Sequence, residues 1–354
     1  MSEKEFVEII HLIKESRFNA IKTVNAELIN LYWNVGKYIS NRLASSLWGQ
    51  KTIEELVLHI EKNYPELKGF SKRGLYRMRQ FYDAYILLDA ESHKKLQIDI
   101  NKNDIIVSPV GTQFQDIRNS LLAKLSWTHH RVIFSRCKSK EELEFYIKMT
   151  IKENYTVREL DRQISASLFE RTMISNIELS PSLQKSNLTN SFKDSYIFEF
   201  LNIPEHHDEK ELQQALIHQM KNFILELGKD FLFIGEEYKI LVGNSDFYID
   251  LLFYHRGLQC LVAFELKTDK FKPEHLGQLN FYLEALDRDV RKENENHSIG
   301  VLLCKDKDQE VVEYAMSRSL SPTMISEYKT QLPDKKLLKQ KLHEIFENKI
   351  MAYE

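Results

Sequence analysis

The chain has 354 residues, of which 29% are charged, and its formal net charge at pH 7 is −3. This length is long for one domain and sufficient for two, each of which can bury its own core. The weakly negative net charge excludes a global electrostatic attraction to nucleic acid, so any contact with DNA must come from local basic faces.

The sequence has no feature of a membrane or secreted protein. No apolar run approaches the length of a transmembrane helix, and the polar start Met1–Glu5 is not a signal peptide. The three cysteines, Cys137, Cys260 and Cys304, lack the spacing of metal ligands. We therefore expect core thiols in a reducing compartment, and a cytoplasmic protein without a membrane partner.

The sequence patterns of the first half of the chain predict helices. Phe6–Leu47 is nearly free of glycine and proline and carries apolar residues at helical spacing. A second helix is predicted over Thr52–Tyr64, where Thr52 opens a capping-box pattern. Residues 94–116 predict a surface loop, and residues 118–169 predict a further helical block.

A third helix, Lys72–Leu88, can be capped by Ser71 and begins with a strongly basic segment that contains no acid. A basic helix just after a turn is typical of the recognition helix of a helix-turn-helix. A solvated helix face explains the same charges equally well, and both interpretations stay open. The candidate DNA-binding residues of this helix are Lys72, Arg73, Arg77 and Arg79.

Residues 172–192 are rich in Ser, Asn and Thr and predict a linker. The sequence therefore predicts a helical domain over residues 1–171, which we expect to bind DNA or a protein partner, and a second domain over residues 193–354. The second domain begins with a helix over Leu212–Leu227, which Gly228 ends, and continues with a strand at Phe231–Ile234.

Two adjacent apolar runs in the second domain carry isolated charges. Phe247–Tyr254 predicts a buried strand that contains Asp250, and the next run ends in Glu265 and Lys267. Alternate residues of a strand share a face, so Glu265 and Lys267 point the same way. Burying these charges is costly unless something pairs with them, and a divalent metal bound by both carboxylates is one solution. A structural ion pair between Asp250 and Lys267 is another.

The order of elements indicates a fold. Pro273 suits the first turn of a helix that carries Gln278 and Tyr282, and Ser298–Cys304 predicts another buried strand. The order of one helix, three strands, one helix and one strand resembles the αβββαβ core of the PD-(D/E)XK nuclease superfamily. Gln278 and Tyr282 match the Q-x-x-x-Y motif of its RecB-like branch. The resemblance implies a restriction-endonuclease-like domain after the all-helical one.

The resemblance narrows to one family. Phe223–Gly228, Phe247–His255 and Phe271–Glu274 are similar to the YhcG family, and so is Leu125–His130 in the first half. The C-terminal resemblance covers roughly residues 190–345. It implies a helical N-terminal domain of unknown function joined to a nuclease domain.

The residues themselves define a candidate catalytic and metal site. Asp250 and Glu265 offer hard oxygen ligands suited to Mg²⁺ or Mn²⁺, and the backbone carbonyl of Leu266 is a further candidate ligand. Lys267 can orient the attacking water or neutralise the charge that builds on the phosphate. By resemblance, Gln278 and Tyr282 brace this site and the substrate.

A further acid often comes from the first helix in the superfamily. Glu226 is the only acid near the end of the predicted helix, while Glu236 and Glu237 on the following strand compete for the same role. Lys270 and Lys272, which closely follow the E-x-K triplet, are assigned to DNA contact.

We therefore expect a metal-dependent endonuclease that cuts double-stranded or branched DNA. A catalytically silent nucleic-acid-binding protein is one alternative, although the intact D…E-x-K and Q-x-x-x-Y patterns argue against it. The other is an assembly protein in which the apolar stripe of Phe6–Leu47 forms homo-oligomers.

Overall fold

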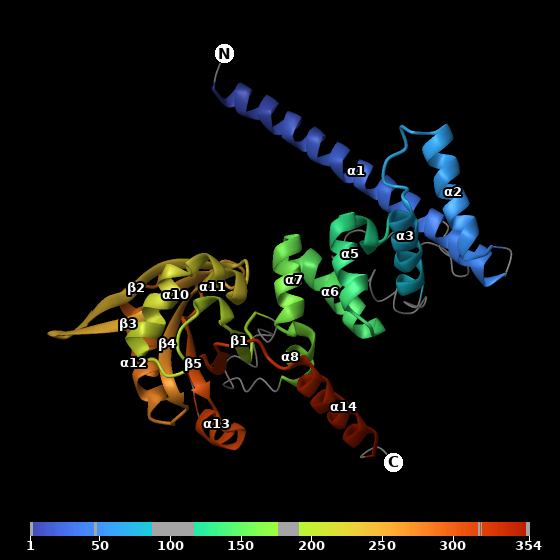
Figure 1. Ribbon diagram of the computed structural model, residues 1–354. Helices are drawn as coiled ribbons and strands as arrows, with labels where there is room; N and C mark the ends of the chain where they lie inside the picture. The colour runs from blue at the N-terminus through green and yellow to red at the C-terminus, as the bar shows by residue number, and fades with distance from the viewer. Residues whose placement is uncertain are drawn as a thin grey trace. The chain divides into compact units, whose positions relative to one another are not determined.

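The computed structural model describes residues 3–45, 48–86, 117–175, 191–317, 319 and 321–351. The chain divides into two compact units, residues 1–164 and 165–354, which we call the N-terminal and the C-terminal unit (Figure 1). The predicted loop at residues 94–116 and most of the predicted linker lie outside the described residues. None of the helices in the described ranges has the length and hydropathy that crossing a membrane requires.

The N-terminal unit is built from helices, as the sequence predicts. Two of them cross closely because Gly36 has no side chain: a Cβ at this position would lie 2.1 Å from the Met78 carbonyl oxygen. Trp33 packs at the same crossing, where its ring contacts those of Phe81 and Tyr82. The helices are α1 (Glu3–Ala44), α2 (Gln50–Asn63), α3 (Lys72–Tyr85), η1 (Leu121–Lys124), α5 (Trp127–Arg136), α6 (Lys140–Glu153) and α7 (Val157–Ser165).

The start of α2 differs from the prediction. The helix begins at Gln50 because Gly49 occupies the N-cap, and the Thr52 hydroxyl accepts the Gly49 N–H at 3.3 Å. The start of α3 is confirmed, since the hydroxyl of the N-cap Ser71 accepts the Gly74 N–H at 3.3 Å. The connection between α2 and α3, residues 64–71, is longer than the three- or four-residue turn of a standard helix-turn-helix.

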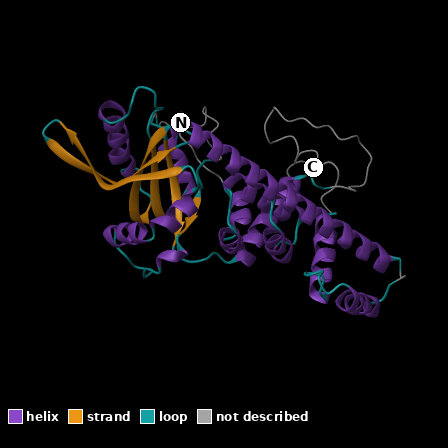
Figure 2. Cartoon of the chain, turned by 90° about the horizontal axis from the view of Figure 1, so that it is seen from above, coloured by secondary structure: helices purple, strands orange, loops and turns teal. Residues whose placement is uncertain are grey.

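The C-terminal unit contains a six-stranded mixed sheet in the order β1-β6-β5-β4-β3-β2, drawn in orange in Figure 2. β2, β3 and β4 are antiparallel, whereas β4, β5, β6 and β1 pair in parallel. The sequence of helix, three strands, helix and strand confirms the predicted fold class, with the first helix divided in two at Gln219. The strands are β1 (Ser195–Ile197), β2 (Phe231–Val242), β3 (Ser245–His255), β4 (Cys260–Lys270), β5 (Ile299–Asp306) and β6 (Thr323–Lys329).

Apolar cores on both faces of the sheet hold the helices in place. One core joins the sheet to α10 (Glu209–His218) and α11 (Met220–Leu227), and the other joins it to α12 (His275–Asp289). Gly300 allows α12 to approach β5, because a Cβ there would lie 2.8 Å from the Leu279 side chain. The remaining elements of the unit are η3 (Glu199–Leu201), α8 (Leu168–Ile174), α13 (Gln309–Met316) and α14 (Lys335–Met351).

The sheet forks between β3 and β4. The two strands pair only from Leu251↔Phe264 to His255↔Cys260. Beyond this point the first half of β3 pairs with β2 alone, and the second half of β4 pairs with β5 alone. The hairpin of β2 and β3 accordingly extends away from the rest of the sheet (Figure 2). Asp250 directly precedes Leu251, and Glu265 directly follows Phe264, so both residues lie at the fork.

Candidate active site

Asp250 is fixed by two hydrogen bonds at the fork. Its carboxylate accepts the backbone N–H of Leu266 at 2.8 Å, which replaces a strand partner that this amide would otherwise need. Its carbonyl oxygen accepts the side-chain amide of Gln213, from α10, at 2.8 Å. Burial raises the pKa of the Asp250 carboxyl, although the bond from Leu266 and the charge of Lys267 oppose the shift. The aspartate is therefore tightly positioned yet costly to keep charged.

Glu265 is almost fully buried, with 1% of its surface exposed. Burial and the neighbouring charge of Asp250 raise the pKa of its carboxyl to about 7, against the opposing charge of Lys267. Its Oε1 atom lies 3.1 Å from the Lys267 ammonium, whereas its Oε2 atom is buried and makes no hydrogen bond with the described residues. Such an oxygen is an acceptor that still needs a cation or a proton.

Lys267 is held by two carboxylates. Besides Glu265, its Nζ atom contacts both oxygens of Glu209, at 3.1 and 3.3 Å. Burial lowers the pKa of Lys267, but the charges and hydrogen bonds of Glu265 and Glu209 outweigh burial and leave the pKa above its ordinary value. The lysine is thus a protonated point charge beside the two strand carboxylates.

Sequence reasoning missed Glu209, the first residue of α10. The signal was present: Asp208 and Glu211 form a capping box, in which each side chain accepts the backbone N–H of the other residue. This pattern sets the helix start at Glu209, three residues before the predicted start at Leu212. Gln213, one turn further along α10, donates to Asp250. Glu209 therefore contacts β4 through Lys267, and Gln213 contacts β3 through Asp250.

Gln278 and Tyr282 lie together on α12, as their spacing predicts. The Gln278 side-chain amide donates to the Tyr282 hydroxyl at 2.7 Å. Burial raises the pKa of Tyr282, the hydrogen bond from Gln278 opposes the shift, and the charges of Glu265, Asp250 and Lys267 also act on the phenol. The structure therefore joins the two residues of the Q-x-x-x-Y pair, and their role at the site stays a prediction.

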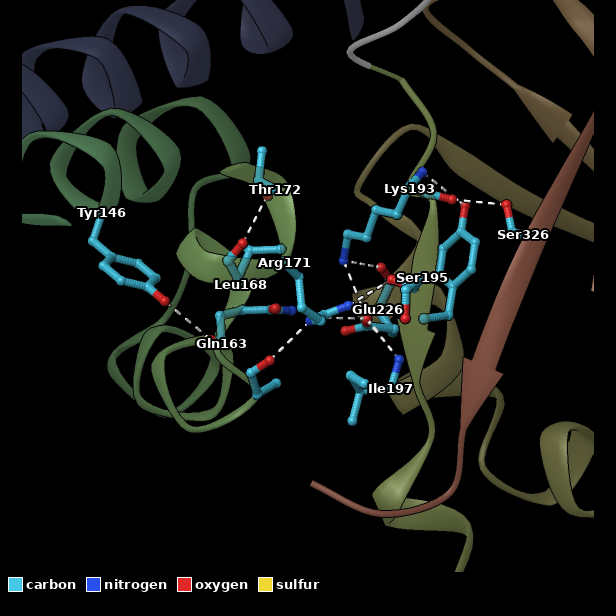
Figure 3. A network of polar contacts seen from close by, with 12 residues as sticks. Tyr146, Gln163, Leu168, Arg171, Thr172, Lys193, Ser195, Ile197, Glu226 and Ser326 are labelled. Atoms are coloured by element: carbon cyan, nitrogen blue, oxygen red, sulfur yellow. Dashed lines mark hydrogen bonds and ion pairs between the residues drawn. The ribbon is translucent and has the colours of Figure 1, made fainter. Parts of the chain in front are cut away.

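Glu226 does not belong to this group, and its assignment as a metal ligand needs correction. Its carboxylate is fully buried and lies 3.5 Å from the Arg171 guanidinium and 3.4 Å from the Lys193 ammonium. It also accepts the N–H of Ile197 at 3.1 Å. Figure 3 shows both cations directed at Glu226. A carboxylate neutralised by two cations joins α8, β1 and α11 and is a structural element.

The other acids and the lysines after E-x-K differ in position. Glu237 has a left-handed backbone, with φ of 41°, and its charge acts on Asp250, whereas no such effect links Glu236 to the site among the described residues. Lys270 lies 3.6 Å from Asp308, and Lys272 lies 2.7 Å from Asp269. Both lysines are half exposed and already have acidic partners.

The basic residues predicted on α3 belong to the N-terminal unit. Lys72 forms an ion pair with Glu54, and Arg79 lies 3.1 Å from Asp83. Arg73 and Arg77 have no carboxylate partner among the described residues. Two of the four cations are therefore paired with acids, and the other two are not paired with an acid among the described residues.

The carboxylates fit a Mg²⁺ ion that keeps part of its water shell, and not an ion that is enclosed by protein ligands. In the described residues, no group of three or more His, Cys, Asp and Glu side chains is arranged to hold a metal. Two carboxylates are nevertheless sufficient for Mg²⁺, which keeps several waters and takes further oxygens from a phosphate. The buried, unpartnered Oε2 of Glu265 beside Asp250 supplies the hard oxygen that such an ion requires. The Leu266 carbonyl stays a predicted ligand.

Comparisons with known proteins agree with this geometry. A family model described as the YhcG PDDEXK nuclease domain matches residues 189–343, and one described as the DUF1016 N-terminal domain matches residues 8–171. The protein named "Putative nuclease YhcG" of Escherichia coli (strain K12) is 31% identical over 350 residues, which cover 94% of this chain and 92% of that protein.

Two solved structures are similar to part of the chain. A repair endonuclease from Pyrococcus abyssi matches 37% of this chain and 50% of its own, with 16% identity and a TM-score of 0.24. A complex of EndoMS with double-stranded DNA matches 36% of this chain and 46% of its own, with 17% identity and a TM-score of 0.24.

Proposed function

The chain belongs to the YhcG family of nucleases, and from this premise we propose that it is a divalent-metal-dependent endonuclease that hydrolyses phosphodiester bonds in DNA. One observation carries the proposal. A buried carboxylate with an unpartnered oxygen, Glu265, lies at the sheet fork beside Asp250 and 3.1 Å from a lysine ammonium. Two acids that can hold a metal ion, with a cation beside them, suit metal-assisted hydrolysis of a phosphodiester.

Asp250 and Glu265 would hold Mg²⁺ or Mn²⁺, with the Leu266 carbonyl as a third oxygen and Glu209 as the acid from the first helix. The ion, when bound, would polarise the phosphate and lower the pKa of a bound water. Lys267 would stand beside the scissile phosphate, where its ammonium offsets the negative charge that develops on the phosphoryl oxygens. Gln278 and Tyr282 would fix the substrate side of the site through their mutual hydrogen bond.

The two carboxylate contacts of Lys267 support a positioning role for Glu209. Glu209 and Glu265 both hold the ammonium before substrate arrives. Glu265 would offer its unpartnered Oε2 to the ion while Oε1 stays on Lys267, and Glu209 would hold the same ammonium as a second carboxylate partner. This role makes Glu209 a positioning residue even where it does not touch the metal itself.

One alternative keeps specific support, namely an assembly protein. Within the described part of α1, apolar side chains remain exposed, among them Phe18 at 67% and Ile21 and Val24 at 68% each. An apolar stripe of this extent favours association with another surface. The native mass of the purified chain separates a monomer from an oligomer, and it does so independently of any cleavage.

The test of the nuclease proposal is a panel of linear, branched, nicked and single-stranded DNA incubated with Mg²⁺, Mn²⁺ or a chelator. We expect strand cleavage that needs the metal and is lost in Lys267→Met. Single-stranded RNA in the same panel separates DNA from RNA specificity. No cleavage of any substrate under either metal, or equal cleavage by the parent and Lys267→Met, would overturn the proposal.

A further inference from the structure

The basic residues of α3 fall into two classes. Lys72 and Arg79 are neutralised within the fold, by Glu54 and by Asp83. Arg73 and Arg77 carry no carboxylate partner among the described residues, and they lie one helical turn apart on α3. Arg73 is exposed and Arg77 is half-buried. Their positive charges are therefore uncompensated within the described part of the N-terminal unit.

A third arginine joins them from another helix. α5 packs on α3 through aromatic rings, with the Phe81 centroid 5.4 Å from that of Trp127 and 4.9 Å from that of His130. Arg77 lies one turn before Phe81 on α3, and Arg131 lies one turn after Trp127 on α5. The packed rings thus bring the two arginines to the edge of the same helix–helix contact. Arg131 likewise has no carboxylate partner among the described residues.

The charges of the three arginines act on one another. The pKa of the Arg77 guanidinium is lowered from its ordinary value, first by desolvation and then by the positive charges of Arg131 and Arg73. Like charges on two packed helices repel unless an anion lies between them. The chain has a net charge of −3, yet no acid of the described residues pairs with these arginines. The cluster is therefore suited to an external anion.

We propose that Arg73, Arg77 and Arg131 form an anion-binding site that takes the phosphodiester backbone of nucleic acid. This rests on the proposed function in so far as DNA is the substrate of the C-terminal unit. Guanidinium groups suit phosphate because their planar donors form paired hydrogen bonds with its oxygens. Contacts with phosphate carry no sequence information, so the site supplies affinity that is independent of sequence.

Nucleic acid is favoured over an acidic protein because the same chain carries a nuclease-family domain that needs a polyanionic substrate. The cluster also comes from two packed helices and not from a long basic tail. It therefore contacts a few adjacent phosphates, and its removal changes the salt dependence of binding by a small, countable amount.

The experiment compares two double variants of the full chain that remove the same charge. Arg77→Gln/Arg131→Gln removes two arginines of the proposed site, and Lys72→Gln/Arg79→Gln removes two cations that have acidic partners. Both are made in a Lys267→Met background, so that a labelled duplex is bound without being cut. Binding is measured from 50 to 300 mM salt, and circular dichroism and thermal melting confirm that each variant folds.

We expect Arg77→Gln/Arg131→Gln to weaken binding about tenfold or more at low salt and to reduce the slope of log K against log salt by about 1.8, roughly 0.9 for each lost phosphate contact. The matched control is expected to stay within about twofold of the parent, with its slope preserved. Equal losses in the two variants, or no loss in either, would overturn the site.

Two further measurements distinguish a failure of the proposed anion site from a failure of the proposed nuclease function. If polyglutamate binds the parent as tightly as DNA and loses affinity in Arg77→Gln/Arg131→Gln alone, the site takes acidic protein and the assignment to nucleic acid is wrong. With Lys267 intact, the arginine variant is expected to need about tenfold more DNA than the parent for half-maximal cleavage, in line with its weaker binding. Absence of cleavage in the parent itself is a failure of the proposed function and not of this site.

Discussion

The Lys267 ammonium lies 3.1 Å from the Glu265 carboxylate, so the two charges of the E-x-K triplet form an ion pair on one face of β4. Both side chains are largely buried, with 13% of Lys267 and 2% of Glu265 exposed. In such surroundings each charge strongly affects the proton affinity of the other. We therefore expect the charge state of this pair to decide when a metal ion can bind.

Lys267→Met is expected to abolish cleavage and to raise the pKa of Glu265 above about 7, because the charge that holds this pKa down is lost. Half-maximal metal binding then moves to higher pH, which a series of calorimetric titrations with Mn²⁺ at several pH values measures. Lys270→Met, which removes an exposed lysine paired with Asp308, is the control and leaves that midpoint unchanged. A midpoint that does not move in Lys267→Met contradicts the coupling.

The stability of the metal-free protein is expected to depend on the pH through Glu265. The carboxyl has a pKa of about 7 in the folded chain and an ordinary value of 4.5 when unfolded. Folding therefore favours the protonated form, and this contribution to stability is fully present below about pH 4.5 and is lost as the pH rises to about 7. Thermal melting between pH 5.5 and 8 with a chelator present measures it.

Glu265→Gln is the matched variant for that measurement, because the amide has nearly the same shape and does not titrate. We expect its melting temperature to fall less than that of the parent over the same pH range, and to exceed the parental value at pH 8. Cleavage by the parent should instead increase as the pH rises through about 7, since only the ionised carboxylate binds a cation. A parental melting curve that is flat with pH would argue against a buried, titrating Glu265.

Substitutions of Asp250 are expected to separate chemistry from stability. Asp250→Asn and Asp250→Ala both remove the charge, so both should lose metal binding and cleavage. Asn can still accept the N–H of Leu266, whereas Ala leaves that buried donor unsatisfied at a cost of about 1–3 kcal/mol. Urea unfolding of both variants should therefore find Asp250→Ala less stable than Asp250→Asn. Full cleavage by either variant would remove Asp250 from the site.

Glu209 and Glu226 are expected to respond in opposite ways. Glu209→Gln should reduce cleavage with little change in stability, because this side chain is 48% exposed and its pairing with Lys267 is screened by solvent. Glu226→Gln leaves two cations without their buried partner and should cost about 3–5 kcal/mol in the free energy of unfolding.

Cleavage and urea unfolding, measured on both glutamate variants, distinguish the two roles. Folded Glu226→Gln is expected to keep metal-dependent cleavage. If that variant loses cleavage while its free energy of unfolding stays parental, the reassignment from Glu226 to Glu209 is wrong.

The central residues could be predicted because their signals are local. Asp250 and Glu265 interrupt apolar strands, where an unpaired charge is anomalous, and the alternation of β4 already places Lys267 beside Glu265. The spacing of Gln278 and Tyr282 on one helix face likewise predicts their contact. The order of elements was confirmed for the same reason, since each helix and strand has its own periodicity and stop signals.

Other features could not be predicted because they depend on which elements meet in space. Lys72 is neutralised by Glu54, which lies on a different helix, and Arg131 is far from Arg77 in the sequence. Glu226 stands among the apolar residues of its helix, and nothing in the surrounding sequence indicates its two cationic partners. The start of α10 could have been predicted from the capping box of Asp208 and Glu211. Placing the helix start at Leu212 left Glu209 out of the predicted site.

The hydrogen bond from the Leu266 amide to Asp250 also gives the site a spectroscopic reporter of its own. An ordinary strand amide donates to a carbonyl oxygen, whose character does not change with pH or metal. This amide donates to a carboxylate, and such bonds strengthen with the negative charge of the acceptor. The ¹H–¹⁵N resonance of one residue in a buried strand should therefore move when Asp250 gains a proton or a cation. The occupancy of the site could then be followed in solution without a substrate and without any turnover.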